Sequence, residues 1–192
     1  MEAPLSYLLQ FGNLNQQQTE FIYSMAEELK IRKDEYFSGA GKIPRHLQQV
    51  GFVVEGIIRI CYHNNEGEDI TKYFIDKNHL IANYQYFEAN TEASEYLQAV
   101  TDCKLIVFSK QNCENISNTV VGWDSIQNKM IQKFLLQKLE RRSILLEQDG
   151  TTRYLTFLEK FPTLVNLVPL AYIASYLGIT PSSLSRIRKN IR

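Results

Sequence analysis

The C-terminal segment 170–192 constrains the fold more than any other part of the sequence. It reads LAYIASYLGITPSSLSRIRKNIR, and its apolar residues before Gly178 repeat at the spacing of one face of a short helix. Gly178 allows the left-handed backbone that ends a helix and turns the chain. Thr180 then suits a helix N-cap and Pro181 suits the first helical position. Because Ala174 is small enough for two helices to cross closely, the segment predicts a helix-turn-helix.

The same segment carries a positive charge that the chain as a whole does not have. Lysine and arginine number 21, aspartate and glutamate also number 21, and the formal net charge is +0. Segment 170–192 contains no acidic residue, and its cations are Arg186, Arg188, Lys189 and Arg192. A local excess of charge in a neutral chain indicates a local binding site.

The outward face of the second helix combines short hydrogen-bond donors at its tip with long cations further along. In a helix that lies in the DNA major groove, the tip meets base edges and the cations reach guanine or phosphate. An ordinary helical hairpin with a solvated basic face is the alternative, but the spacing of small residue, glycine, cap and proline favours DNA binding. The candidate DNA-binding residues are Thr180, Ser182, Ser183, Ser185, Arg186, Arg188 and Lys189.

Upstream of this segment, the hydrophobic period changes from helical to strand-like. Residues 14–29 repeat at helical spacing, with Asn15 as a candidate N-cap. Several short β-rich runs follow, separated by glycine and by the turn-forming stretch HNNEGED. Region 30–109 is therefore predicted to form an antiparallel roll of short strands. The expected strands are 52–54, 57–62, 70–75, SEYLQAV and CKLIVFS.

After residue 118 the helical period returns and persists as far as residue 147. One apolar stripe of this long helix begins with four residues, Trp123, Ile126, Met130 and Phe134, and continues through Leu135 and Leu139. Such a stripe can pack on the roll, or it can pair with the same helix of a second subunit, as in a coiled coil. A helix buried wholly within one chain is the alternative. We predict that the four residues form a two-fold dimer seam.

Other classes of protein find little support in the sequence. There is no phosphate-binding glycine loop, no zinc-protease motif and no nucleophile elbow, so no enzyme activity is expected. The three cysteines, Cys61, Cys103 and Cys113, are far apart and fit neither a disulfide framework nor a zinc motif. They are expected to be reduced, partly buried thiols. No metal and no cofactor is predicted.

The sequence shows no membrane or export signal. Glu2 stands where a signal peptide would carry positive charge. No stretch approaches the roughly 18 uninterrupted apolar residues of a membrane span. A cytoplasmic protein is therefore expected.

The order of roll, long helix and helix-turn-helix resembles the Crp/Fnr family of bacterial transcription regulators over nearly the whole chain. Two stretches carry the resemblance, VGFVVEGIIRICYHNNEGEDITKYFIDKNHLI and RYLTFLEKFPTLVNLVPLAYIASYLGITPSSLSRIRKNI. The second is similar to the DNA-binding domains of family members from Bacteroidetes-like bacteria. The resemblance implies an α+β fold: an N-terminal antiparallel β-roll of the cyclic-nucleotide-binding (jelly-roll) type, a long dimerisation helix and a winged-helix-like C-terminal domain.

The resemblance also implies a domain organisation and partners. It implies a sensor domain at 1–117, a dimerisation helix at 118–147 and a DNA-binding domain at 148–192. Many family members continue into a winged hairpin, so the wing is expected to be reduced, missing or truncated after Arg192. The implied function is sequence-specific DNA binding by a homodimer, together with RNA polymerase. A ligand-binding or protein-interaction module with a structural helix-turn-helix is the alternative.

At the positions of the family's effector site, this sequence lacks the residues that bind cyclic nucleotide in the family. Cyclic nucleotide is held in the family by a Gly-Glu pair and an Arg-Ser pair, but Ala82 and Asn83 stand at the first pair and Ala93 and Ser94 at the second. Without the carboxylate and the cation, a cyclic phosphodiester would have only backbone amides as partners. A degenerate pocket is expected, with an unknown small-molecule effector or none. Iron-sulfur ligation lacks its four cysteines. Haem binding is not indicated, because none of His46, His63 and His79 has a second candidate ligand at a recognisable spacing.

Overall fold

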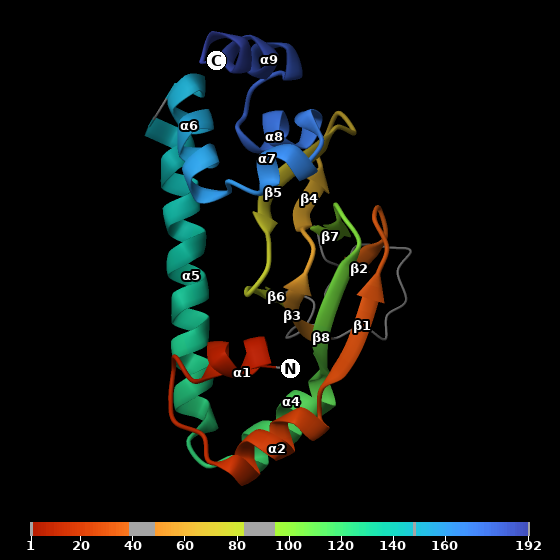
Figure 1. Ribbon diagram of the computed structural model, residues 1–192, viewed down its shortest axis with the longest axis vertical. Helices are drawn as coiled ribbons and strands as arrows, with labels where there is room; N and C mark the ends of the chain where they lie inside the picture. Colours follow the sequence, from red (N-terminus) through yellow and green to blue (C-terminus); the bar gives the residue numbers. More distant parts are fainter. Residues whose placement is uncertain (1, 39–48, 83–94, 148, 192) are drawn as a thin grey trace.

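The computed structural model describes residues 2–38, 49–82, 95–147 and 149–191. Figure 1 shows a β-roll with one long helix along its side and a group of short helices stacked on one end. The strands are β1 (Glu27–Ile31), β2 (Tyr36–Ser38), β3 (Gln49–Glu55), β4 (Ile58–His63), β5 (Asp69–Ile75), β6 (Leu80–Ala82), β7 (Tyr96–Ala99) and β8 (Cys103–Ser109). The helices are α1 (Glu2–Leu8), α2 (Gln16–Ser24), α4 (Lys110–Thr119), α5 (Trp123–Glu147), α6 (Gly150–Lys160), α7 (Leu164–Leu167), α8 (Leu170–Tyr176) and α9 (Pro181–Asn190).

The strands form two antiparallel four-stranded sheets, in the orders β1-β8-β3-β6 and β2-β7-β4-β5. Their inner faces meet in a core that includes Phe37, Ile58, Ile60, Leu97 and Leu105. Gly56 has φ +95°, and a Cβ there would lie 2.5 Å from the carbonyl oxygen of Asp102, so only glycine fits this corner of the roll. The predicted α+β fold with an antiparallel roll is confirmed.

The helix expected at 14–29 is shorter in the structure. Asn15 caps α2 as predicted, because its side chain accepts from the Gln18 amide at 2.9 Å and Gln18 Oε1 accepts from the Asn15 amide. The helix ends at Ser24, however, and Leu29 pairs with Leu105 in an antiparallel ladder. Strand pairing with a distant part of the chain therefore overrides the local helical spacing.

The long helix begins later than residue 118. A separate helix, α4, ends at Thr119, and Gly122 has φ +83°, a left-handed backbone that breaks the helical run. Helix α5 then extends from Trp123 to Glu147. No helix in the described ranges combines the length and apolarity needed to span a membrane.

The predicted dimer seam on α5 is contradicted at Trp123 and Ile126, because these two residues are buried inside this chain. Ile126 is 4% exposed and lies in a buried cluster with Trp123. The other members of this cluster come from the rest of the chain and are Tyr7, Phe11, Ile22, Phe52, Ile116 and Val120. Met130 packs against the same cluster. Phe134 faces Tyr7, Tyr73 and Leu80. The stripe therefore holds the roll and the N-terminal helices on α5, the intramolecular alternative.

The N-terminal segment closes tightly over α5. A Cβ at Gly12 would lie 2.8 Å from Ile126 Cγ1, so a larger residue would force the two segments apart. Lys129 Nζ donates to the Phe11 carbonyl at 3.1 Å, and Lys133 Nζ donates to Gln10 Oε1 at 3.0 Å. Lysines thus satisfy acceptors just beyond the end of α1 while their stems cover apolar surface.

The exposed apolar residues of α5 lie on its other side. Leu136 and Leu139 are 61% and 65% exposed, and Leu135 is also exposed. Because successive residues of a helix are rotated by about 100°, Met130 and Leu139 lie on opposite faces of α5. Helix α5 therefore has one apolar face covered by its own chain and a second apolar face open to solvent.

The cysteines provide a test of this core. Burial raises the pKa of Cys61 and of Cys113 to about 12, and burial also raises the pKa of Cys103. Since the thiolate is the reactive form, only about 0.01% of a thiol with a pKa of about 12 is reactive at pH 8. We expect iodoacetamide at pH 8 to leave the three thiols of the folded protein unmodified while it alkylates all three in urea, as counted by mass spectrometry. Rapid alkylation of the folded chain would contradict this packing.

Candidate nucleic-acid interface

Helices α8 and α9 form the predicted helix-turn-helix, and the turn has the hydrogen bonds of a Schellman motif. The Gly178 amide donates to the Ser175 carbonyl at 3.1 Å, and the Ile179 amide donates to the Ala174 carbonyl at 3.0 Å. Gly178 has φ +63°, and a Cβ there would meet nothing within 4 Å. Glycine is therefore needed at this position for its backbone conformation and not for space.

The start of α9 is held by Thr180, as predicted. The Ser183 amide donates to Thr180 Oγ1 at 3.1 Å, and Pro181 occupies the first helical turn. The Thr180 hydroxyl also donates to Ser183 Oγ at 3.0 Å and lies 2.9 Å from Ser182 Oγ. The structure therefore places Thr180 as the cap that orders the tip of α9.

Four of the predicted DNA-binding residues lie on the exposed face of α9. Ser182, Ser185, Arg186 and Lys189 are exposed together on one side of α9. Leu184, on the opposite side, is fully buried. The Arg186 guanidinium approaches the tip of the helix, where Nη2 lies 3.5 Å from Ser183 Oγ. This exposed face offers hydroxyl groups near the N-terminus of the helix and cations further along, the arrangement that suits base edges and phosphates.

Arg188 does not share that face. It follows Leu184 by one helical turn, so it points to the same side and is half-buried. Its charge placed it among the predicted DNA-binding residues, but the charge does not show which way the side chain points. Asn190 is exposed and extends the polar surface near the end of the helix, and sequence reasoning missed it because no local signal separates it from ordinary helix residues.

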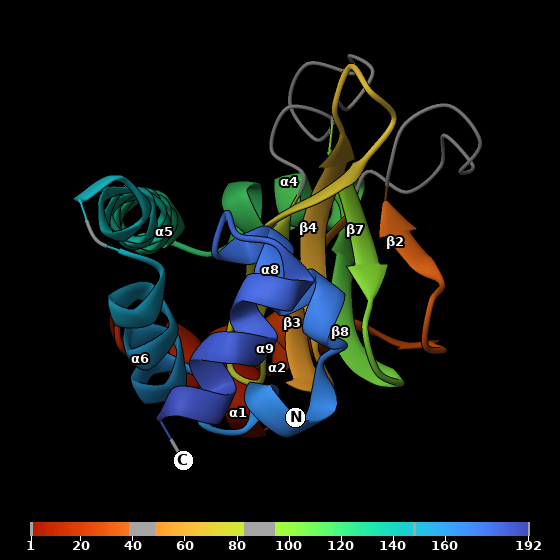
Figure 2. The ribbon, with the colours of Figure 1, turned by 90° about the horizontal axis from the view of Figure 1, so that it is seen from above.

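The helix-turn-helix is supported by its own small core and by the roll. Ile173, Ala174, Leu177 and Leu184 are buried between α8, α9 and α6. Figure 2, viewed from above, shows α9 lying over α8 beside α6. A Cβ at Gly150 would touch Ile179 at 3.3 Å, which shows how closely the start of α6 approaches the turn. The exposed face of α9 is thus presented by packed elements rather than by a loop.

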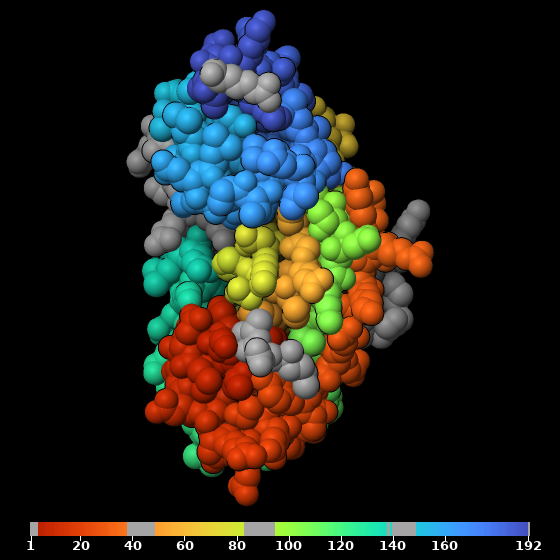
Figure 3. All heavy atoms as spheres, viewed as in Figure 1, coloured from red at the N-terminus to blue at the C-terminus, as the bar shows by residue number. Residues whose placement is uncertain are grey.

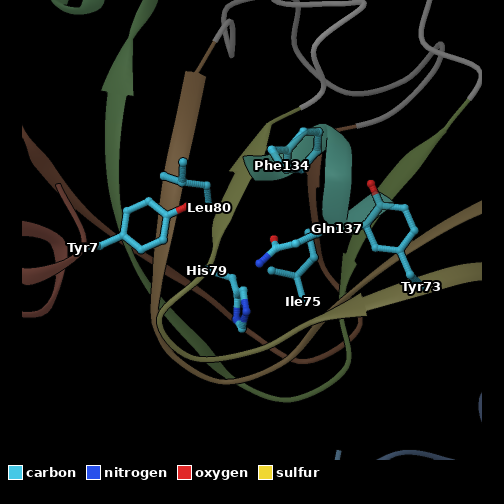
Figure 4. Close-up of a pocket in the computed structure, with 7 residues that line it drawn as sticks. All are labelled: Tyr7, Tyr73, Ile75, His79, Leu80, Phe134 and Gln137. Atoms are coloured by element: carbon cyan, nitrogen blue, oxygen red, sulfur yellow. The ribbon is translucent and has the colours of Figure 1, made fainter. Parts of the chain in front are cut away.

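Most of the predicted effector pocket lies outside the described residues. Ala82 is half-buried at the end of β6, and Asn83, Ala93 and Ser94 belong to the range that the structure does not describe. Nearby, a hollow between α5 and the roll has a cavity volume of about 20 Å³, room for about one water molecule. Figure 4 shows its lining, which comprises Tyr7, Tyr73, Ile75, His79, Leu80, Phe134 and Gln137.

Within 2–38, 49–82, 95–147 and 149–191, no group of three or more histidine, cysteine, aspartate or glutamate side chains could hold an ion. His79 Nδ1 lies 2.9 Å from Asp76 Oδ1, an ion pair when the imidazole is protonated. His63 stacks edge-on against the Tyr96 ring.

Comparison with known proteins gives matches by structure alone. No protein-family model and no curated protein sequence matches the chain. FixK2 from Bradyrhizobium japonicum superposes with a TM-score of 0.70 at 20% identity, over 86% of this chain and 84% of that one. A putative crp/fnr-family transcriptional regulator from Eubacterium rectale gives 0.70 at 15% identity, over 92% and 83%. The c-di-GMP-responsive global regulator CLP from Xanthomonas campestris gives 0.68 at 15% identity, over 92% and 91%. The chain therefore has the fold of the Crp/Fnr-type transcription regulators.

Proposed function

We propose that this chain is a sequence-specific DNA-binding transcription regulator of the Crp/Fnr type, that it acts as a homodimer without enzyme activity, and that it does not depend on cyclic nucleotide. The observation that carries the proposal is the exposed face of α9, where Ser182, Ser185, Arg186 and Lys189 stand together on a capped and packed helix. The structural neighbours, which are named as regulators, support the same class. Contact with RNA polymerase rests on the family resemblance alone.

Stabilisation of the helix dipole accounts for only part of the positive charge on α9. Arg188 and Lys189 lie in the last turn of α9, where cations stabilise the negative end of the helix dipole. Arg186 lies before that turn and is exposed, so helix stability does not explain it. A cation that is exposed next to hydroxyl groups at a helix tip supports direct readout of bases.

The second apolar face of α5 supports the dimer. Leu135, Leu136 and Leu139 are exposed on a long, straight element that leads toward the helix-turn-helix (Figure 1). Their spacing is that of a coiled-coil seam. A second copy of α5 would bury these leucines and relate two α9 helices by a two-fold axis. Two recognition helices about 34 Å apart can read successive major grooves of one operator.

The proposal that the protein does not depend on cyclic nucleotide rests on the side chains at the positions of the family's nucleotide-binding residues. Alanine at 82 and 93 and asparagine at 83 supply neither the carboxylate nor the cation that the family uses for ribose and phosphate. An unpaired phosphodiester in a concave site is strongly disfavoured.

DNA binding is tested with a selected palindromic duplex and a random duplex at several salt concentrations. Arg186→Ala should weaken specific binding by about 1–3 kcal/mol and relax the preference at one base pair. Lys189→Ala should weaken both duplexes alike and flatten the salt slope by about one. Arg188→Ala, half-buried and off the exposed face, is the matched control and should change the base preference least. Binding that is equal for both duplexes in the wild-type protein would favour the alternative, an interaction module with a structural helix-turn-helix.

The dimer is tested by sedimentation. Leu136→Glu should leave the fold intact, since the side chain is exposed in one chain, and should weaken dimerisation by about 3 kcal/mol or more because two buried leucines are lost and two charges face each other. Leu167→Glu, an equally exposed leucine on α7, is the control and should stay dimeric. A wild-type protein that is monomeric at micromolar concentration would refute the proposed seam.

Nucleotide independence is tested by thermal melts with and without millimolar cyclic AMP or cyclic GMP. A ligand at a hundredfold excess over its dissociation constant would stabilise the fold by about 2.7 kcal/mol. We expect the curves to coincide, and a clear upward shift of the midpoint would show that the pocket binds nucleotide.

A further inference from the structure

A charged side chain is buried where the helix-turn-helix meets the roll. Arg59, on β4, is 1% exposed, and all three of its guanidinium nitrogens donate hydrogen bonds. Nε and Nη2 donate to Gln98 Oε1 at 2.8 Å and 2.6 Å, and Nη1 donates to Thr71 Oγ1 at 3.1 Å. Nη2 also forms an ion pair with Asp69. These partners satisfy a charge that could not otherwise be buried.

The remaining face of the guanidinium is covered by the helix-turn-helix. Tyr172, on α8, stacks on it with the Arg59 carbon 3.7 Å from the ring centroid, a cation–π contact. Arg59 and Tyr172 are therefore held together across the boundary between the roll and the DNA-binding helices. Figure 3 shows the surface of this boundary, with the C-terminal helices seated directly on β4 and β5.

Two further contacts flank the stacked pair. The Thr71 amide, on the outer edge strand β5, donates to Ser175 Oγ of α8 at 2.9 Å, so α8 satisfies a sheet-edge donor. Phe74, fully buried, lies 5.5 Å from the Tyr176 ring and 6.1 Å from the Phe157 ring between centroids. The strand register aligns Gln98, Arg59 and Phe74 in one row across the sheet, so α8 and α6 cover that row as a unit.

We propose that Arg59 and Tyr172 form an interdomain latch that positions the helix-turn-helix on the roll and thereby sets the orientation of α9 for DNA. The proposal rests on the proposed function. Neither residue touches the exposed face of α9, so both act through α8 as positioning residues.

The energetic consequence of the latch is preorganisation. In a dimer, specific binding requires both α9 helices to be held at one separation and angle, and any freedom of the helix pair lowers the population that can bind the operator. Binding to random DNA needs no such geometry, because phosphate contacts dominate it. The latch therefore affects specific binding selectively.

The primary test replaces the Tyr172 ring. Tyr172→Leu removes the cation–π contact and keeps an apolar side chain, and Tyr172→Phe, the matched control, keeps the aromatic ring. We expect Tyr172→Leu to lower operator affinity by roughly tenfold or more, the size of a desolvated cation–π contact, and to leave random-DNA affinity unchanged. Exchange of the Thr71 amide, measured by hydrogen exchange, should accelerate by a similar factor. Tyr172→Phe should match the wild-type protein in both measurements.

A second pair of variants tests the cation. Arg59→Met, which keeps the length of the side chain without its charge, should repeat the loss of operator specificity and the faster Thr71 exchange, and the exposed Arg32→Met should change neither. A Tyr172→Leu protein with wild-type exchange at Thr71 overturns the latch. Faster exchange with an unchanged ratio of operator to random affinity overturns its positioning role. If the wild-type protein binds no DNA, the proposed function and the positioning role fail, and the exchange measurement still decides whether Tyr172 holds α8 on the roll.

Discussion

A buried guanidinium can exist only where every part of it has a partner, and the packing of the two halves of this molecule follows from that constraint. Arg59 sits on the outer face of a sheet, where an ordinary surface arginine would extend into water. Gln98 and Thr71 come from neighbouring strands, and Tyr172 comes from α8. Because the aromatic rings of Phe74, Phe157 and Tyr176 pack beside this group, the core of the roll and the core of the helix-turn-helix form one continuous buried cluster.

A second constraint applies to helix α5: a large apolar helix face is stable only when other apolar surface shields it from water. One face is covered within the chain by α1, α2 and the roll, and this is why Trp123 and Ile126 are buried. The other face, with Leu136 and Leu139, is open. Periodicity in the sequence shows that a helix has an apolar stripe, but it does not show which surface covers that stripe. The sequence therefore predicts the long helix, but it does not show which of its faces packs inside the chain.

The features predicted well from the sequence depend on residues close together in the chain. The Asn15 and Thr180 caps and the Gly178 turn are each determined by positions within one helical turn. The features that were missed depend on distant pairing: Leu29 became a strand residue because β8 lies beside it, and the contact of Arg59 with Tyr172 joins residues with no local signal. Arg188 lies between these cases, since its charge is visible in the sequence but its direction depends on which face of α9 is buried.

This division between local and distant determinants separates two properties of the candidate DNA-binding site. The chemistry of the α9 surface resides in a few exposed side chains, and these can change without disturbing the core because they contact little of it. The orientation of that surface depends on packing against the roll, through residues such as Arg59 and Tyr172 that lie away from the exposed face of α9. Substitutions on β4, β5 or α8 are therefore expected to act on the geometry of binding, and substitutions on the exposed face of α9 to act on its sequence preference. A change on the outer face of the β2-β7-β4-β5 sheet would reach α9 through α8, without any contact to the exposed face of α9.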